Sequence, residues 1–301
     1  MHTIDERTAM LALLLGKGAR WPAVAGEVME RGSAAAVLED RLGGEALFPV
    51  VEQAPEVSRA REMVDACLRQ GVEVLSLCDP GYPARLRDIH EMPPVVFLRG
   101  RMRPDPRAIA VVGSREASDY GLKMAYSIAA QLARMDVTVV SGLAAGVDAA
   151  AHRAALDAGG RTVAVIGTGI NRCYPRQNKD LQDEIAERGM ILSQFLPDAA
   201  PTRASFPMRN AVMSGYAAAT VVVEAGEHSG ARIQARYALQ HGRPLIFPSE
   251  LLGNQWAREF AQRPGVYVVD RMEEMVEVVE ARLRDADATL AEIAREAAVA
   301  W

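Results

Sequence analysis

Five glycine-bearing turns are the part of this chain best suited to chemistry. Each follows directly after a β-branched or apolar stretch. In chain order they are Gly113-Ser114-Arg115, Ser141-Gly142, Gly146, Gly167-Thr168-Gly169 and Ser214-Gly215. Turns of this kind present backbone N–H groups at strand ends, where those groups bind phosphate or another anion. The sequence therefore predicts an anion-binding site built largely from backbone.

The first turn carries the fullest set of phosphate-binding groups. Gly113 lets the backbone come close to a ligand, Ser114 adds a hydroxyl, and the guanidinium of Arg115 can contact two phosphate oxygens at once. Taken alone, this turn is about as well explained by a strand–helix connection with a surface arginine. The prediction of a site therefore depends on the other turns.

Two segments further along add polar groups. Arg209 and Asn210 begin an apolar helix after Phe206-Pro207, and Ser229-Gly230 opens another helix, whose N-terminus favours anions. Glu224 lies nearby and would repel a phosphate unless it caps a helix or acts in catalysis.

Asp148 and His152 lie one helical turn apart after Gly146. For Asp148 we expect a helix-capping role rather than a catalytic one. The pair has the groups for acid and base catalysis, but a structural hydrogen bond between them is the stronger expectation.

Several familiar sites are excluded. The segment Gly167–Arg172 has Arg172 at the third glycine position of the dinucleotide fingerprint, and there is no Walker G-x-x-x-x-G-K-[ST] or H-E-x-x-H. Cys67, Cys78 and Cys173 lack C-x-x-C spacing, which argues against a disulfide framework or a structural zinc site. We expect no metal and no cofactor.

Alternating strands and helices must position the turns. From Ala108 onward, short apolar strands alternate with helices, which predicts a doubly wound, mostly parallel α/β sheet of the extended Rossmann-like type. Such sheets bind ligands beyond the carboxyl ends of their strands, where most of the turns fall.

We expect three regions along the chain. Residues 1–70 form a small helical domain, residues 71–270 form the Rossmann-like core, and residues 271–301 form a helical segment. Within the last region, 272–296 is acidic and Ala-rich and is predicted to form one or two surface helices that close the sheet.

Composition and charge narrow the class of protein. Half of the residues are hydrophobic and a quarter are charged, as in a soluble globular protein, and the longest apolar run, Ala9–Leu15, is too short to span a bilayer. We therefore expect a cytoplasmic protein without a membrane segment. The net charge of −5 argues against coating of nucleic acid by bulk electrostatics, but it leaves room for a local basic groove.

Taken together, the turns resemble one bacterial family, the DNA-processing protein A (DprA, also called Smf) family. The resemblance spans roughly residues 5 to 250. The matching segments include Ala110–Arg115, Val139–Ala144, Gly146–His152, Ile166–Gly169, Tyr174-Pro175, Phe206-Pro207, Arg209-Asn210, Ser214-Gly215, Val221–Glu224 and Ser229-Gly230.

The resemblance implies both a fold and a function. Family members have an extended Rossmann-like core, often preceded by a helical domain similar to a sterile-alpha-motif fold. They bind single-stranded DNA, dimerise and help to load the recombinase RecA in natural transformation, and they are not known as enzymes. The predicted groove comprises Gly113, Ser114, Arg115, Ser141, Gly142, Gly146, Gly167, Gly169, Arg209, Asn210, Ser229 and Gly230.

This chain departs from the family pattern at two basic positions. The family usually has arginine where this chain has Ala145, and a second basic residue after Arg-Asn where it has Ala211. Each change removes a possible phosphate contact, which points to a divergent member.

An alternative function stays open at this stage. The chain also fits a nucleotide sensor or a nucleotide-processing enzyme similar to the cytokinin-activating phosphoribohydrolases. In that case Glu224 or Asp148 would be the acid, and Arg115 and Arg209 would hold the phosphate. The Gly-Gly-x-Gly-Thr-x-x-Glu motif of those enzymes is not present, so DNA binding is the favoured interpretation.

Overall fold

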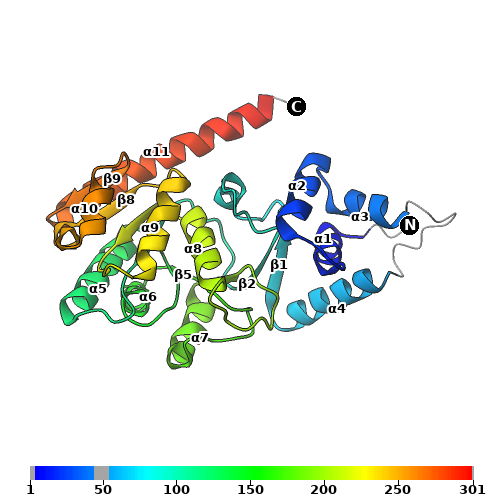
Figure 1. Ribbon diagram of the computed structural model, residues 1–301, viewed down its shortest axis with the longest axis horizontal. Helices are drawn as coiled ribbons and strands as arrows, with labels where there is room; N and C mark the ends of the chain where they lie inside the picture. Colours follow the sequence, from blue (N-terminus) through cyan, green and yellow to red (C-terminus); the bar gives the residue numbers. More distant parts are fainter. Residues whose placement is uncertain (1–3, 44–53, 300–301) are drawn as a thin grey trace.

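The computed structural model describes residues 4–43 and 54–299, and the side chains of residues 4–42 and 54–285. One nine-stranded sheet runs through this part of the molecule, in the order β1-β2-β6-β5-β4-β3-β7-β8-β9 (Figure 1). The first two strand pairs, β1 with β2 and β2 with β6, are antiparallel, and all other neighbours are parallel. The predicted doubly wound, mostly parallel α/β fold is confirmed.

The strands are short, and most are buried on both faces. Every residue of the central strand β3 is buried, as expected for a parallel sheet covered by helices on both sides. The strands are β1 (Val72–Ser76), β2 (Val95–Gly100), β3 (Ala108–Val112), β4 (Thr138–Ser141), β5 (Thr162–Val165), β6 (Met190–Ser193), β7 (Ala219–Val222), β8 (Leu245–Pro248) and β9 (Val266–Val269).

Helices cover the two faces of the sheet. On one face, α5 (Asp119–Arg134), α6 (Val147–Asp157) and the first turns of α11 (Met272–Val299) pack on Ile109 and Val111 of β3. On the other face, α8 (Ser205–Tyr216), α9 (Gly230–Gln240) and α10 (Gln255–Ala261) pack with Ala110 and Val112. The alternation of side chains along β3 therefore divides the core into two layers. The helix α7 (Lys179–Arg188) lies beside α6 and β6.

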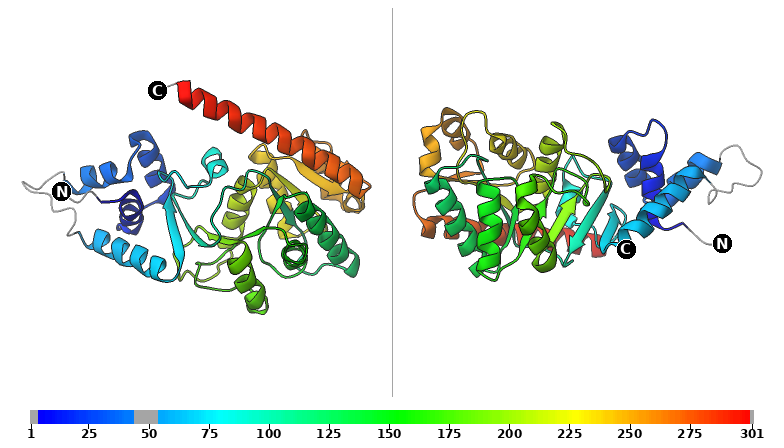
Figure 2. Two further views of the ribbon diagram at one scale, coloured as in Figure 1. Left: turned by 180° about the vertical axis from the view of Figure 1, so that it is seen from behind. Right: turned by 90° about the horizontal axis from the view of Figure 1, so that it is seen from below.

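Four helices precede the sheet and lie at its β1 edge (Figure 2). They are α1 (Glu6–Leu15), α2 (Trp21–Arg31), α3 (Ala34–Gly43) and α4 (Pro55–Arg69). Helix α1 is buried along most of its length, because the other helices and β1 pack around it. The remaining short elements are the 3-10 turns η2 (Ala84–Asp88), η3 (Arg176–Asn178) and η4 (Ser249–Gly253).

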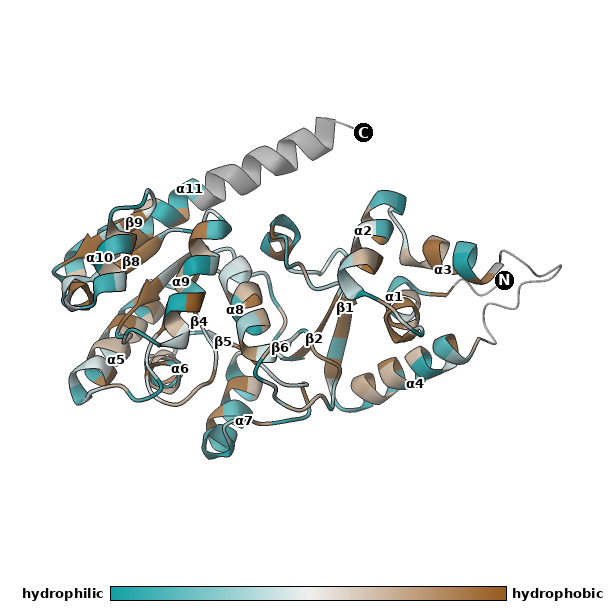
Figure 3. Ribbon diagram, in the orientation of Figure 1, coloured by the Kyte–Doolittle hydropathy of each residue, from teal (hydrophilic) through white to brown (hydrophobic). Residues whose placement is uncertain are grey.

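The hydropathy pattern matches this arrangement: the brown, apolar segments in Figure 3 include the central strands and one side of several helices. The apolar core continues from the N-terminal helices into the sheet, since Val57 of α4 and Val74 of β1 belong to one buried cluster. The domain boundaries at 70 and 270 stay predictions, and residues 1–3, 44–53 and 300–301 of those ranges lie outside the described residues.

The end of the predicted core contains a strand that the sequence analysis did not predict. This ninth strand, β9, pairs with β8, and α10 lies between them in the chain. The β9 run Val-Tyr-Val-Val is short and unevenly buried, with Val269 buried and Val268 exposed, and the strand is defined by its pairing with β8. The predicted helix over 272–296 is one helix, α11. No helix in the described part is long and apolar enough to cross a membrane.

Candidate nucleic-acid groove at the strand ends

The order of strands reverses at β3. Strands β4, β5 and β6 follow one another on one side of β3. The chain then returns, and β7 pairs with β3 on its other side. In open α/β sheets, ligands bind beyond the carboxyl ends of strands at such a switch point. A groove of about 580 Å³ lies there, lined by the turns after β3 and β7 and by the first turns of α8 and α9.

The structure brings seven of the twelve predicted site residues into this groove. The seven are Gly113, Ser114, Arg115, Arg209, Asn210, Ser229 and Gly230. Whether these residues bind phosphate stays a prediction, and their geometry divides them into exposed groups and groups already used by the fold.

The first turn is fixed by close backbone packing. A Cβ at Gly113 would lie 2.5 Å from Cγ2 of Val147, so only glycine fits without a shift. The N–H of Ser114 donates to the carbonyl of Glu224 (2.7 Å), which ties the turns after β3 and β7 together. The hydroxyl of Ser114 accepts a hydrogen bond from the N–H of Glu116 (3.1 Å).

Arg115 is the exposed cation of the groove. Its guanidinium carbon lies 4.9 Å from the centre of the Phe206 ring, and it forms no ion pair with the residues that the structure describes. The ring of Tyr174, which is 45% exposed, lies 5.6 Å from the Phe206 ring and is tilted by 44° against it. Phe206 therefore contacts both Arg115 and Tyr174, and we call the three side chains the Arg115–Phe206–Tyr174 row.

Arg209 occupies a very different environment. It is only 5% exposed, and its Nη1 donates to the carbonyls of Gly142 and Val165. Its Nε donates to Oδ1 of Asn210 (3.0 Å), whose Nδ2 in turn reaches the carbonyl of Gly230 (3.4 Å). Burial lowers the pKa of Arg209, although the carboxylate of Asp148 partly offsets this effect. Arg209 therefore stabilises the backbone at the base of the groove.

The second turn, residues 142–146, adjoins the groove through Ala144 and has a strained conformation. Leu143 has φ +57° and Gly146 has φ +76°, and the first of these is uncommon for a residue with a side chain. Nδ2 of Asn178 donates to the carbonyl of Leu143 (3.0 Å), and the N–H groups of Gly142 and Ala144 donate to Asp148. These bonds hold the strained turn in place.

The expected roles of Asp148 and His152 were wrong. Asp148 accepts from the preceding turn instead of capping α6, whose N-cap is Gly146 and has no side-chain bond. His152 pairs with Thr162 (2.7 Å) and not with Asp148. Burial raises the pKa of Asp148, opposed by the Arg209 charge. Burial, together with the Arg209 charge, lowers the pKa of His152 to about 3, so this imidazole is neutral.

The start of α9 follows the sequence prediction. Ser229 is the N-cap, and its hydroxyl accepts from the N–H of Ala231 (3.2 Å). The carboxylate of Glu224 is bonded at a different helix. It accepts hydrogen bonds from the N–H of Ser118 (3.0 Å) and from the Ser118 hydroxyl, and this hydroxyl itself caps α5. The carboxylate thus stabilises the N-terminus of α5 and does not compete for an anion at α9.

Five predicted residues lie outside the groove. The hydroxyl of Ser141 is buried and donates to the carbonyl of Val111 (2.7 Å), and Gly142 leaves space for the Arg209 guanidinium. Gly146 lines a neighbouring hollow that shares Arg115 with the groove. Gly167 packs against the Phe206 ring, and Gly169 packs against the backbone of residues 196–197. In these places glycine serves close packing.

The two departures from the family pattern lie in different places. Ala145 lines the neighbouring hollow beside Arg115, so an arginine there would extend the basic surface. Ala211 is fully buried in α8.

Gln234 is a groove residue that the sequence analysis missed. It lines the groove from α9, on the buried face that also holds Ala231, Ala235 and Ala238. The sequence does contain a signal for this residue. Gln234 is a polar residue within a series of apolar residues spaced by three and four positions, which is the spacing of a buried helix face.

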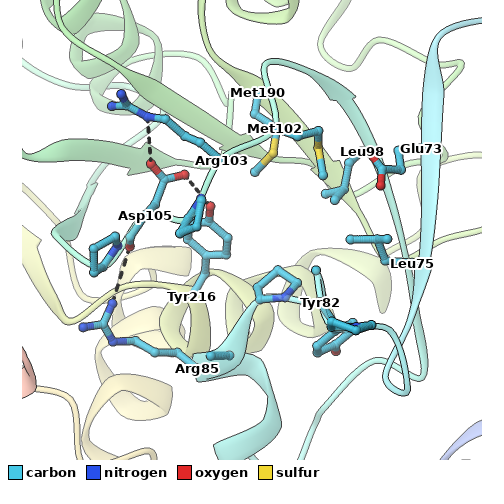
Figure 4. Close-up of a pocket in the computed structure, with 16 residues that line it drawn as sticks. Glu73, Leu75, Tyr82, Arg85, Leu98, Met102, Arg103, Asp105, Met190 and Tyr216 are labelled. Atoms are coloured by element: carbon cyan, nitrogen blue, oxygen red, sulfur yellow. Dashed lines mark hydrogen bonds and ion pairs between the residues drawn. The ribbon is translucent and has the colours of Figure 1, made fainter. Parts of the chain in front are cut away.

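A second cavity, of about 480 Å³, lies at the opposite end of the strands from the groove (Figure 4). It lies near the amino ends of the parallel strands, and its lining includes Asp105, Tyr82, Met102 and Tyr216. Asp105 is already bonded to Arg161 and Tyr216. Ligands of α/β sheets bind at the carboxyl ends, so the groove is the stronger candidate site.

Comparison with known proteins places the chain in a family. Residues 73–283 match the model of the family described as DNA recombination-mediator protein A. The Smf protein of Synechocystis is 41% identical over 175 residues, which cover 56% of this chain and 44% of that protein. The chain thus matches less than half the length of this relative.

Two solved structures have the same fold. DNA processing protein A of Streptococcus pneumoniae superposes with a TM-score of 0.70 at 30% identity, covering 92% of this chain and 98% of that one. DNA processing protein A of Helicobacter pylori, whose structure concerns its binding of single-stranded DNA, has a TM-score of 0.63 at 24% identity, covering 71% and 96%. The resemblance of the glycine turns is therefore confirmed, and the chain belongs to the DNA recombination-mediator protein A family.

Proposed function

We propose that this protein binds single-stranded DNA in the groove between the turns after β3 and β7. The observation that carries the proposal is the Arg115–Phe206–Tyr174 row, in which an exposed guanidinium lies over the Phe206 ring and that ring contacts a second aromatic ring. Proteins that bind single strands without sequence preference combine cations for the backbone with ring faces for the bases. The relative from Helicobacter pylori binds single-stranded DNA.

In this proposal the phosphate contacts come from two sides of the groove. Arg115 supplies a guanidinium from the first turn, and α9 begins at Gly230 on the opposite wall. The N-terminus of a helix favours negative charge through its unpaired N–H groups and its dipole. Arg209 supports the groove from below, and we assign it a positioning role.

The alternative of a nucleotide-processing enzyme is less favoured. Such an enzyme needs a carboxylate free to act on a substrate. Glu224 is bonded at the N-terminus of α5, and Asp148, although it lines the groove, accepts two backbone hydrogen bonds from the preceding turn. Both carboxylates are used by the fold, so binding is the better supported activity.

Two protein partners complete the proposal. Membership of the family supports a homodimer and the delivery of bound DNA to the recombinase RecA. Natural transformation and recombination are then the processes in which the protein acts.

Replacing Arg115 with alanine should weaken binding of an oligo-dT strand by between about 10- and 150-fold, because a hydrogen bond to a charged group contributes about 1.5–3 kcal/mol. Fluorescence anisotropy with a labelled strand across a salt series measures this. The slope of log Kd against log salt should also fall by about 0.7, because the variant neutralises one phosphate fewer.

Arg134 provides a matched control, since it is exposed at the far end of α5 and lies outside the groove lining. Arg134→Ala should bind the strand as the wild type does. Equal losses in both variants would mean that only overall charge matters, and no binding by the wild type at low salt would end the proposal.

A further inference from the structure

The second cavity, near the amino ends of the parallel strands, has the size and the lining of a small-molecule site. Its volume of about 480 Å³ lies within the range of roughly 300–1,000 Å³ that ligand pockets occupy. The walls come from β1, β2, the start of β6, the segment before β3 and the end of α8. Most of the lining is apolar or aromatic, and its larger side chains are Leu75, Tyr82, Leu98, Met102, Met190 and Tyr216.

Four charged residues line this cavity, and three of them already interact with one another. A nitrogen of Arg103 lies 3.8 Å from the carboxylate of Asp105, and Arg85 donates to the Asp105 carbonyl (3.5 Å). The carboxylate of Asp105 also accepts hydrogen bonds from Arg161 and Tyr216. The charges on this side of the cavity are therefore used by the fold.

Glu73 is the fourth charged residue, and Figure 4 shows it across the cavity from Asp105. It is partly exposed, and its carboxylate has no hydrogen bond or ion pair with any residue that the structure describes. On β1 it lies opposite Leu98 of β2 and shares a face of the strand with Leu75. A carboxylate without a partner on an apolar wall favours a ligand that carries a positive charge.

The other walls suit the hydrophobic body of an organic cation. In Figure 4 the rings of Tyr82 and Tyr216 and the thioethers of Met102 and Met190 surround the space. Aromatic rings attract cations, and the polarisable sulfur of methionine contacts aromatic groups favourably. Both tyrosine hydroxyls are bonded, one to the carbonyl of Pro93 and one to Asp105, so the rings contribute apolar surface.

Two other classes of ligand fit less well. A metal ion needs several ligating side chains, and no group of three His, Cys, Asp or Glu side chains that could hold one occurs in the described part of the chain. A hydrophobic anion would face the unpaired carboxylate of Glu73.

We infer that this cavity binds a small hydrophobic amine, whose ammonium group pairs with Glu73 and whose ring lies among the tyrosines and methionines. The cavity is then a second ligand site, separate from the groove. The inference does not depend on the proposed function.

Ligand-observed NMR titrations with two probes of the same ring system test the site. Tryptamine is a cation at neutral pH, and indole-3-propionate is an anion of similar size. The wild type should bind tryptamine with a Kd of about 2 mM or tighter, the weak end of what a ligand of this size attains. It should bind indole-3-propionate at least about tenfold more weakly, because two like charges would meet at Glu73.

Replacing Glu73 with glutamine removes the charge and keeps the volume nearly constant. Glu73→Gln should weaken the binding of tryptamine by about fivefold, as expected for the loss of one partly exposed ion pair. Glu62→Gln changes the net charge by the same amount at an exposed position of α4 outside the cavity, and it should bind both probes as the wild type does.

A cavity-filling variant tests the location independently of charge. Met102 is 38% exposed, so Met102→Trp should fold and should abolish the binding of tryptamine by filling the cavity. Met29→Trp places the same ring at a 56% exposed position of α2, away from the cavity, and should leave binding unchanged.

Several results would overturn the inference. They are no binding of tryptamine by the wild type, equal binding of the two probes, or equal losses in Glu73→Gln and Glu62→Gln. Full binding by Met102→Trp would place the amine elsewhere and overturn it as well. If the melting temperature of free Glu73→Gln falls, Met102→Trp and Met29→Trp decide the question. The affinity for oligo-dT enters none of these tests, so the cavity and the groove are judged separately.

Discussion

Replacing Asp105 with alanine should lower the free energy of unfolding by about 3–5 kcal/mol, the usual cost of breaking a buried ion pair on one side. The Asp105 side chain is almost fully buried and receives hydrogen bonds from Arg161 at 2.7 and 2.9 Å. It also accepts from Tyr216 (2.6 Å) and Thr138 (2.8 Å), and the bond from Tyr216 is visible in Figure 4. The variant would leave the Arg161 guanidinium buried without its counter-charge. Urea denaturation at neutral pH measures this destabilisation.

The destabilisation should depend on pH in a defined direction. Burial alone would raise the pKa of Asp105, but hydrogen bonds from Arg161 and Tyr216 outweigh it and hold the pKa below the ordinary 3.8. A carboxyl group with a lowered folded-state pKa stabilises the fold above its unfolded-state value, and this contribution is lost as the pH falls through the folded-state value. The difference between wild type and Asp105→Ala should therefore be constant above about pH 5 and shrink below 3.8.

Asp183 offers the comparison, because among the residues that the structure describes its one ion pair is an exposed pair with Lys179. Asp183→Ala should change the unfolding free energy by less than about 1 kcal/mol. If Asp105→Ala is equally mild, the buried cluster at the amino ends of the strands does not hold the scaffold together.

Replacing Arg209 with methionine should also destabilise the fold, by about 3–5 kcal/mol, because three buried hydrogen bonds and a buried charge are removed together. The carbonyls of Gly142 and Val165 would no longer receive hydrogen bonds from Nη1, and Asp148 would be without the positive charge that favours its ionised form. Strand binding should fall as a consequence, since the floor of the groove would rearrange. Urea denaturation of the free protein separates the two effects.

Arg115 is the matched control for Arg209. Its side chain is exposed and packs over the Phe206 ring, so Arg115→Ala should change stability by no more than about 1 kcal/mol. If Arg209→Met instead keeps full stability and loses only DNA affinity, Arg209 is a direct phosphate contact, as its sequence position suggests.

The fold could be predicted because its signals are local. Helix α9 has the bounds expected from sequence, since Ser229 caps its first turn and its buried face follows a helical period. Strand β9 could not be predicted in the same way. Its four residues are unevenly buried, and what makes Val266–Val269 a strand is the pairing with β8, a contact between residues 21 positions apart in the chain.

The candidate site could likewise be predicted from the sequence only in part. The sequence indicates most of the turns at the strand ends, although the predicted turn Ser214-Gly215 lies inside α8. It does not show which polar groups remain free once the chain has folded. Arg115 and Arg209 are equivalent as residue types, and only the packing of α8 against the sheet buries the second. The free amide of Gln234 likewise depends on which neighbours are already bonded to each other.

The location of the bound strand is the central claim, and photo-crosslinking tests it most directly. Oligo-dT carrying 5-iododeoxyuridine, irradiated with the wild-type protein and mapped by mass spectrometry, should crosslink to peptides that contain Phe206 or Tyr174. Phe206 lines the groove beside Arg115, and Tyr174 contacts Phe206. Crosslinks confined to the N-terminal helices or to α11, with none in these peptides, would place the DNA elsewhere and contradict the account.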